Sequence, residues 1–228
     1  MNMNNRIPPN HPRRPGRQLV RQCAVRRILW ALSLILSLFA LVACSDQPKV
    51  SPVAADAPIL CFGDSLTFGT GASPATSYPA VLAELTGRKT VNSGVPGEVS
   101  ATGLARLPKV LEEVKPGLLI LCHGGNDILQ RKSMDALKDN LRQMIQLAEG
   151  QGVQVVLVAV PEFSLALKPA PLYKELAEER RLPLENKSLA RIVTKHSLKS
   201  DRVHPNAAGY REMAQAVRKV LKDSGAVP

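Results

Sequence analysis

Four short segments of the chain carry groups that could together catalyse acyl transfer. Ser65 offers a hydroxyl in the turn-like stretch GDSLT, and Asn126 offers an amide donor in HGGND. Asp201 stands three residues before His204, close enough for its carboxylate to hold the imidazole Nδ1–H and leave Nε2 free to take a proton from a serine. Gly97, in NSGVPGE, can present a bare backbone N–H to a developing oxyanion.

Each of these segments has a structural interpretation when it is taken alone. A Gly-Asp-Ser turn commonly caps the helix that follows, and a single Asp-x-x-His is more often structural than catalytic. The joint occurrence of all four, in this order and at predicted strand ends, favours chemistry. His204 is the candidate base, because His196 has no motif around it and His11 lies in a segment that we expect to be removed.

The elements that must position these segments follow a β-α-β-α order. Apolar runs predict strands at 59–62, 90–92, 118–122 and 153–160. Apolar residues at helical spacing predict helices around 104–114, 137–148, 173–181, 187–194 and 210–221. Such strands with helices between them indicate a parallel sheet covered on both faces. Ligands bind such sheets at the carboxyl ends of the strands, where three of the four segments fall.

The N-terminal region has the composition of an export signal. Residues 1–43 contain seven arginines and no acidic residue, and residues 28–42 form a 15-residue apolar stretch, which is short for a membrane span. The stretch ends in Leu-Val-Ala-Cys44, which closely resembles the lipobox of bacterial lipoproteins. That resemblance implies cleavage before Cys44 and lipidation of this cysteine. The alternative is an uncleaved N-terminal anchor helix.

We therefore expect a signal peptide at 1–43, a lipidated cysteine with a flexible tether at 44–57, and a single domain at 58–228. The implied location is the bacterial cell envelope, with the domain anchored by lipid and facing the periplasm. Ser45 follows the cysteine where aspartate would by analogy suggest retention in the inner membrane, so the outer membrane is favoured. We expect the protein to be a monomer.

The formal net charge of +11 does not indicate nucleic-acid binding. Without the seven arginines of the signal, 23 basic and 19 acidic residues remain, and they form no run of five like charges. No His-x₃-His, CxxC or acidic cluster has the spacing of metal ligands, so we expect neither a metal nor another cofactor. Cys61 and Cys122 could pair in an oxidising compartment, but a bridge between adjacent strands is strained, which favours free thiols.

In chain order, GDSL at 63–66, a glycine in the second segment, Gly124-x-Asn126-Asp127 and Asp201-x-x-His204 resemble the motifs of the SGNH, or GDSL, hydrolase family. The run NSGVPGEVSATGLARL, followed by KPGLLILCHGGND, looks like the branch of periplasmic thioesterase, lysophospholipase and arylesterase enzymes. The resemblance covers essentially residues 58–222. It implies an α/β fold of flavodoxin-like type, a three-layer α/β/α sandwich with a parallel sheet of about five strands.

The same resemblance assigns roles to the site residues. It implies that Ser65 is the nucleophile, that His204 is the base and that Asp201 orients it. The oxyanion hole would consist of the backbone N–H groups of Ser65 and Gly97 with the Asn126 amide. Gly94 is the competing choice for the glycine donor.

The implied function is a serine esterase that cleaves carboxylic esters through an acyl-enzyme. Short or medium acyl esters, aryl esters, lysophospholipids and thioesters are the expected substrates. One alternative is an O-acetyl esterase of cell-wall or exported polysaccharide, and another is a non-catalytic binding lipoprotein of the envelope. Asp64 and Asp127 flank the site, where the resemblance implies hydrogen-bonding roles. For His123 we leave two roles open, a contact to substrate or a packed residue at a strand end.

Overall fold

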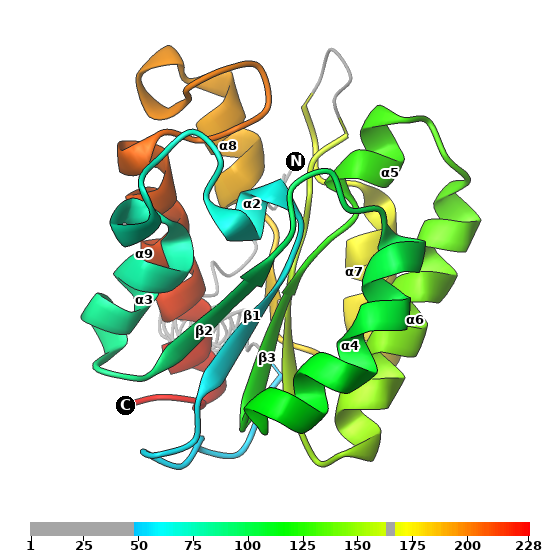
Figure 1. Ribbon diagram of the computed structural model, residues 1–228, viewed down its shortest axis with the longest axis vertical. Coiled ribbons are helices and arrows are strands. Elements are labelled where there is room, and N and C mark those ends of the chain that lie inside the picture. Colours follow the sequence, from blue (N-terminus) through cyan, green and yellow to red (C-terminus); the bar gives the residue numbers. More distant parts are fainter. Residues whose placement is uncertain (1–47, 163–166) are drawn as a thin grey trace, which may run out of the picture. The chain divides into compact units, whose positions relative to one another are not determined.

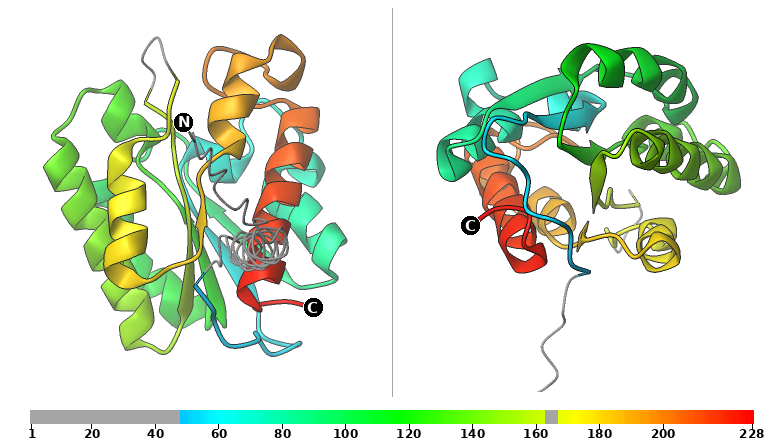
Figure 2. Two further views of the ribbon diagram at one scale, coloured as in Figure 1. Left: turned by 180° about the vertical axis from the view of Figure 1, so that it is seen from behind. Right: turned by 90° about the horizontal axis from the view of Figure 1, so that it is seen from below.

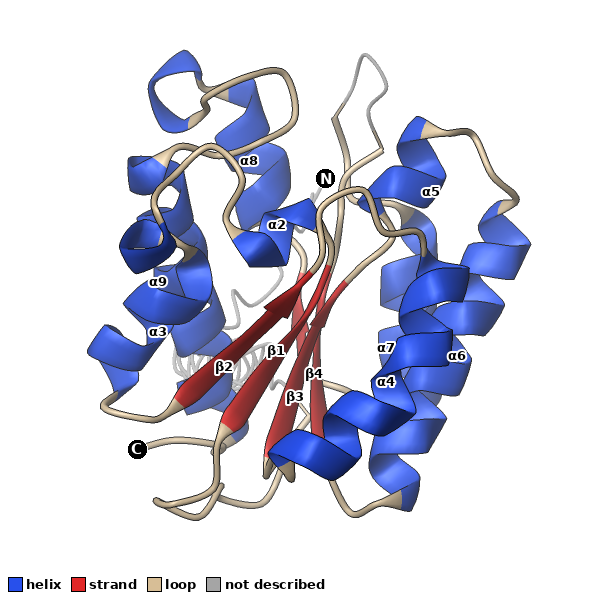
Figure 3. Cartoon of the chain, in the orientation of Figure 1, coloured by secondary structure: helices blue, strands red, loops and turns tan. Residues whose placement is uncertain are grey.

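Five short parallel strands form a single sheet in the order β2-β1-β3-β4-β5 (Figure 3). They are β1 (Ile59–Gly63), β2 (Thr90–Gly94), β3 (Leu118–Cys122), β4 (Gln154–Val158) and β5 (Leu184–Glu185). Every residue of β1 and β3 is buried, as expected for apolar strands that are covered on both faces. The α/β class and the parallel sheet predicted from the sequence are confirmed.

The computed structural model describes residues 48–162 and 167–228. The predicted signal peptide and Cys44 lie outside these residues. No helix within the described ranges combines the length and the apolar character that crossing a membrane requires.

Helices cover both faces of the sheet, which gives three layers (Figures 1 and 2). One face carries α3 (Tyr78–Thr86) and α9 (Ala207–Ser224), which pack against each other. The other face carries α4 (Ser100–Val114), α6 (Met134–Gly150) and α7 (Pro171–Arg180). Two short helices, α2 (Ser65–Phe68) and α5 (Gly125–Leu129), begin where β1 and β3 end. A further short helix, α8 (Ser188–Thr194), packs on α9.

Side-chain caps define the start of the two longest helices that the structure describes. Asn206 accepts a hydrogen bond from Gly209 N at the start of α9, and Ser133 accepts one from Ala136 N at the start of α6. Both helices bury one apolar stripe against the sheet and expose a charged face. The caps fix where each helix begins, and the stripe fixes which side it buries.

Two features differ from the sequence predictions. Strand β5 has only two residues, too few to give a periodic pattern, and it was not predicted. The tether is also shorter than predicted. Val53 is buried and donates from its backbone N to Ala226 O at 2.9 Å, and Val50 N donates to Ser224 O at 3.0 Å. Residues 50–53 therefore pack on the C-terminal segment, because their apolar side chains and backbone N–H groups find partners there, and the ordered domain begins before residue 58.

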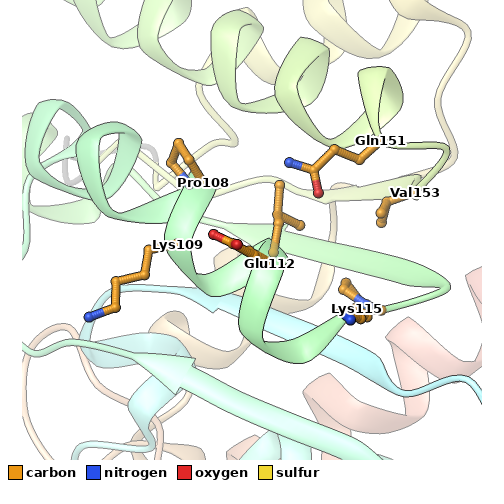
Figure 4. Close-up of a pocket in the computed structure, with 8 residues that line it drawn as sticks. Pro108, Lys109, Glu112, Lys115, Gln151 and Val153 are labelled. Atoms are coloured by element: carbon orange, nitrogen blue, oxygen red, sulfur yellow. The ribbon is translucent and has the colours of Figure 1, made fainter.

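A hollow of about 720 Å³ lies at the amino edge of the sheet (Figure 4). It is lined by the C-terminal half of α4 and by the residues that lead into β3 and β4, namely Pro108, Lys109, Leu111, Glu112, Lys115, Pro116, Gln151 and Val153. None of the residues predicted to do chemistry lines it. The predicted site lies instead at the carboxyl ends of the strands, at the opposite edge.

Cys61 and Cys122 are free and buried, as favoured from the sequence. Burial raises the pKa of the Cys61 thiol to about 12, although a hydrogen bond with Tyr78 acts in the other direction. Because the thiolate is the reactive form of cysteine, this side chain contributes packing rather than chemistry.

Candidate active site

Three of the four segments leave the sheet side by side. Gly63, at the end of β1, is in register with Gly94 of β2 on one side and with Cys122 of β3 on the other. Strand β2 lies on one side of β1, and β3, β4 and β5 follow on the other side, so the strand order reverses at β1. Open parallel sheets bind ligands at such a point. The segments that hold Ser65, Gly97 and Asn126 therefore start from one row of the sheet.

Ser65 is the first residue of α2 and follows β1 after a single residue. Asp64 caps the helix, and its Oδ1 accepts a hydrogen bond from Leu66 N at 3.0 Å. Gly63 makes the turn possible, because a Cβ at this position would lie 1.8 Å from Cys122 O. The structural interpretation of GDSL as a capped turn is therefore correct, and the same turn presents Ser65 at the edge of the sheet.

Asp201 and His204 lie in the loop that leads into α9. Asp201 Oδ1 accepts hydrogen bonds from the backbone N of Val203 and of His204, both at 2.8 Å, and Oδ2 lies 2.7 Å from His204 Nδ1. Burial raises the pKa of Asp201, but the hydrogen bonds from His204 and from the backbone outweigh it and lower the pKa below its usual value. The carboxylate thus stays ionised and fixes the orientation of the imidazole.

The structure brings Ser65, His204 and Asp201 into one hydrogen-bonded chain. His204 Nε2 lies 2.9 Å from Ser65 Oγ, although the two residues are 139 positions apart in the sequence. The His204 side chain is 19% exposed. A substrate can therefore reach the serine, and the imidazole nitrogen that faces it can accept its proton.

Gly94 and Gly97 differ in whether their N–H groups are available. Gly94 N donates to Asn92 Oδ1 at 3.0 Å, and a Cβ on Gly94 would lie 2.0 Å from Phe68 N, so this glycine serves close packing against α2. Gly97 has φ of +80°, and its N–H meets no acceptor among the described residues. Of the two glycines that the sequence left open, Gly97 is the one with a free donor.

Asn126 and Ser65 supply the other two predicted donors. One amide hydrogen of Asn126 Nδ2 is directed at Glu98 O, 3.0 Å away, which leaves the second hydrogen available. The backbone N–H of Ser65 has no acceptor in the described part of the chain. The structure thus leaves an unused hydrogen on each of the three groups named from the sequence.

Two buried carboxylates join the segments, and both were expected to have hydrogen-bonding roles. Asp64 Oδ2 accepts from Gly125 N at 3.0 Å and so ties the serine turn to α5. Asp127 accepts from the backbone N and the Oγ of Ser100, at 2.8 and 2.7 Å, and so caps α4 from outside that helix. Each oxygen of both carboxylates accepts a hydrogen bond from the protein. The described residues contain no cluster of three or more metal-ligating side chains.

A cluster of side chains behind these segments was not predicted from the sequence. Glu98 accepts from Arg106 Nε and Nη2 at 2.9 and 2.8 Å, and its Oε2 lies 3.1 Å from His123 Nε2. His123 is fully buried, which identifies it as the packed strand-end residue rather than a contact to substrate. The signals in the sequence were His123 itself, a carboxylate next to Gly97, and an arginine eight residues after that carboxylate.

Three large apolar side chains are exposed at the same edge of the sheet. Phe68 is 51% exposed, Leu129 47% and Val95 39%. They belong to α2, to the end of α5 and to the loop after β2, the elements that also hold Ser65, Asn126 and Gly97. Exposed apolar side chains on the elements that carry the site could contact an apolar ligand bound there.

The chain matches the family model described as "GDSL-like Lipase/Acylhydrolase family" over residues 61–212. Curated relatives include Esterase TesA of Pseudomonas aeruginosa, 28% identical over 78% of this chain and 94% of the relative. Thioesterase 1/protease 1/lysophospholipase L1 of Escherichia coli is 29% identical over 74% of this chain and 85% of the relative. The Arylesterase of Vibrio mimicus is 28% identical over 83% of this chain and 96% of the relative.

Solved structures agree with these relatives. The crystal structure of TesA superimposes with a TM-score of 0.66 at 28% identity, over 72% of this chain and 98% of that chain. AlinE4, an esterase of the SGNH-hydrolase family, gives a TM-score of 0.56 at 28% identity, over 75% and 97%.

Proposed function

The chain belongs to the GDSL-like lipase/acylhydrolase family and is an esterase, and we propose that it hydrolyses carboxylic esters through an acyl-enzyme formed on Ser65. One observation carries the proposal. The hydroxyl of Ser65 lies 2.9 Å from His204 Nε2, while His204 Nδ1 lies 2.7 Å from an Asp201 carboxylate that two backbone N–H groups hold in place. A serine is activated as a nucleophile by this kind of contact to a positioned base.

In the first half of the reaction, Ser65 Oγ attacks the carbonyl carbon of the ester and its proton passes to His204 Nε2. The carbonyl oxygen becomes an oxyanion, which the N–H groups of Ser65 and Gly97 and the Asn126 amide stabilise. The tetrahedral intermediate then collapses as the bond to the alcohol oxygen breaks. His204 returns the proton to this leaving group, and the acyl chain remains on the serine.

In the second half, water takes the place of the alcohol. His204 Nε2 removes a proton from the water, whose oxygen attacks the acyl carbon, and the same donors stabilise the second oxyanion. The intermediate releases the carboxylic acid, and the proton returns to Ser65 Oγ. Asp201 is not consumed in either half, because its part is to hold Nδ1–H and to stabilise the imidazolium that forms.

The exposed apolar side chains support esters with an apolar acyl or aryl part as substrates. Phe68, Val95 and Leu129 would contact such a part beside the serine. Full burial of an apolar side chain contributes about 1.5–3 kcal/mol, and roughly half of this remains to be gained because these side chains are already about half buried. The names of the relatives, which include an arylesterase and a lysophospholipase, agree with this class.

Replacing Ser65 by Ala tests the assignment of the nucleophile. We expect kcat for p-nitrophenyl butyrate to fall by more than about 10³-fold, because Ser65 supplies the one hydroxyl that contacts His204 Nε2 among the described residues. The melting temperature should change little, since the Oγ makes its hydrogen bond in a part-exposed position. Ser73→Ala, a change at an exposed serine outside the site, is the control. Full activity of Ser65→Ala would contradict the proposal.

A series of esters tests the substrate class. We expect kcat/KM to rise from acetate to medium acyl chains, and Phe68→Ser to remove most of this rise while leaving acetate hydrolysis nearly unchanged. A sharp preference for acetylated glycans over every acyl or aryl ester would instead favour the O-acetyl esterase alternative.

We propose further that the chain is anchored in the bacterial envelope by lipid on Cys44. The support is the sequence alone, an arginine-rich segment followed by an apolar run that ends in Leu-Val-Ala-Cys44. Several acyl chains at about 0.8 kcal/mol per buried CH₂ would hold the protein on a membrane durably. Labelling with radioactive palmitate in a bacterial host should mark the wild type and not Cys44→Ser, whereas equal labelling of both would contradict lipidation at this residue.

A further inference from the structure

We propose that His123, Glu98 and Arg106 form a positioning network that holds two oxyanion donors, Gly97 N–H and the Asn126 amide, at a fixed separation. The inference rests on the proposed function, since it assigns a task within that reaction. None of the three side chains would touch the substrate, so they act through the residues that they hold.

The network joins the two segments that carry the donors. Glu98 directly follows Gly97, and His123 lies three residues before Asn126. The contact of 3.1 Å between His123 Nε2 and Glu98 Oε2 therefore links the segment after β2 to the segment after β3. A second hydrogen bond reinforces the link, because the side-chain amide Nδ2 of Asn126 donates to the backbone O of Glu98 at 3.0 Å. A movement of Glu98 would displace both donors together.

Arg106 anchors this link to the rest of the fold. Its guanidinium donates to both carboxylate oxygens of Glu98, to Ser93 Oγ at 2.7 Å and to Ser93 O at 3.1 Å. The guanidinium carbon also lies 4.1 Å from the centre of the Phe62 ring, which is a cation–π contact. The planar guanidinium thus fixes the carboxylate relative to both β1 and β2.

The helix α4 is shaped to admit the network. At Gly103 a Cβ would lie 2.3 Å from His123 Nε2 and 3.2 Å from Glu98 Oε2, so only glycine leaves room for the contact. Arg106 follows three residues later on the same side of the helix. The pair of a glycine and an arginine at this spacing explains the stretch GLARL, which the catalytic steps do not use.

The hydrogen bonds also settle which ring nitrogen of His123 donates to Glu98. Glu98 is held ionised, because the donors from His123 and Arg106 outweigh the effect of burial and lower its pKa to about 2. A carboxylate only accepts, so His123 Nε2 donates. His123 Nδ1 is buried without a partner among the described residues. His123 therefore acts through Nε2, and its contact to Glu98 is the side-chain hydrogen bond that it makes among the described residues.

The Gly97 turn shows why such support is needed. Gly97 has φ of +80°, and the turn around it is closed by one hydrogen bond, from Glu98 N to Val95 O at 3.2 Å. An oxyanion donor stabilises the transition state only if it stays in place while charge develops. The side chain of Glu98 supplies the rigidity that a short exposed turn does not have.

His123→Leu and His123→Gln form a matched pair for the test. Leucine fills the space without a donor, whereas the glutamine amide can donate from about the position of Nε2. For p-nitrophenyl butyrate we expect His123→Leu to lower kcat about 10-fold to 100-fold with KM within twofold, and the rate of inactivation by a fluorophosphonate to fall in parallel. His123→Gln should restore most of both rates.

Leu141→Ala, in the buried core of α6, provides a control that loses stability away from the site. If the role of His123 is purely structural, His123→Leu and Leu141→Ala should both lower the melting temperature and both leave kcat unchanged. This result would overturn the inference. If His123→Leu does not fold, Glu98→Gln decides, because it keeps the shape and loses the charge. A fall in its kcat supports the network, and an unchanged kcat overturns it. Labelling of wild-type Ser65 tests the proposed function separately.

Discussion

Two histidines in the described part of the chain each contact a carboxylate, yet their surroundings differ in every other respect. His204 lies 2.7 Å from Asp201 and is 19% exposed, and its second nitrogen lies 2.9 Å from Ser65 Oγ. His123 lies 3.1 Å from Glu98 and is fully buried, and its second nitrogen has no partner among the described residues. A carboxylate beside an imidazole therefore does not define a catalytic base. A catalytic base also needs access for the substrate and a nucleophile in contact with its second nitrogen.

The two carboxylates also differ in what they hold. The Asp201 side chain is 53% exposed and bonds within its own turn, so it fixes only the imidazole three residues away. The Glu98 side chain is 3% exposed and is neutralised by Arg106, and it joins segments that are 25 residues apart. The His204–Asp201 pair is arranged to exchange a proton at the surface. The His123–Glu98 pair is arranged to keep the two segments that it joins from moving.

His204→Gln should break the His204–Asp201 pair and give the largest effect. Glutamine cannot take the serine proton, so we expect kcat to fall by about 10³-fold or more, with little change in the melting temperature. Steady-state kinetics with p-nitrophenyl butyrate measures this. His196→Gln changes an exposed histidine outside the site and should keep wild-type rates. Loss of activity in both variants, or in neither, would contradict the distinction between the histidines.

Asn126→Ala should remove one donor that the His123–Glu98 pair holds. We expect a fall in kcat of about 10²-fold with a smaller change in KM, because the amide acts mainly on the oxyanion of the transition state. Asn140→Ala removes another amide of the region, one that donates to Ser100 Oγ at 2.9 Å, and should cost less than about threefold. Equal effects of the two substitutions would show that the amide of Asn126 serves packing alone.

Glu98→Gln should change how stability depends on pH. The folded-state pKa of Glu98 is lowered to about 2 from an ordinary value of 4.5, so the ionised carboxylate stabilises the fold above pH 4.5. That stabilisation, roughly 3 kcal/mol at most, is lost as the pH falls from 4.5 to 2. Urea unfolding across this range should show a shallower loss for Glu98→Gln than for the wild type. Glu113→Gln, at an exposed position, should follow the wild type, and identical slopes for all three would refute the buried pair.

Much of the fold could be predicted from the sequence. The buried strands β1, β3 and β4 carry runs of apolar residues, and the long helices repeat their apolar residues at helical spacing, so local patterns were sufficient. Strand β5 was missed because two residues cannot show a period. The packing of residues 50–53 on the C-terminal segment was missed because it depends on backbone hydrogen bonds to residues more than 170 positions away.

The site was predictable where its chemistry lies in short motifs. Ser65, Asn126, Asp201 and His204 were each named from their segment, and the structure brings Ser65 to the Asp201–His204 pair. The choice of Gly97 over Gly94 needed coordinates, since only the hydrogen bond to Asn92 shows that the Gly94 donor is occupied. The network of Glu98, Arg106 and His123 was not predicted, because Glu98 and His123 belong to different segments, 25 residues apart, and no local pattern shows that they meet.

The most direct test of the account is to locate the covalent adduct of a fluorophosphonate. The protein would be incubated with the reagent, digested and analysed by mass spectrometry. We predict one adduct, on Ser65, that is absent from Ser65→Ala, strongly slowed in His204→Gln and formed at the wild-type rate in His196→Gln. An adduct on another residue, or labelling of Ser65 that does not depend on His204, would contradict the central claim that the exposed histidine–carboxylate pair activates this serine.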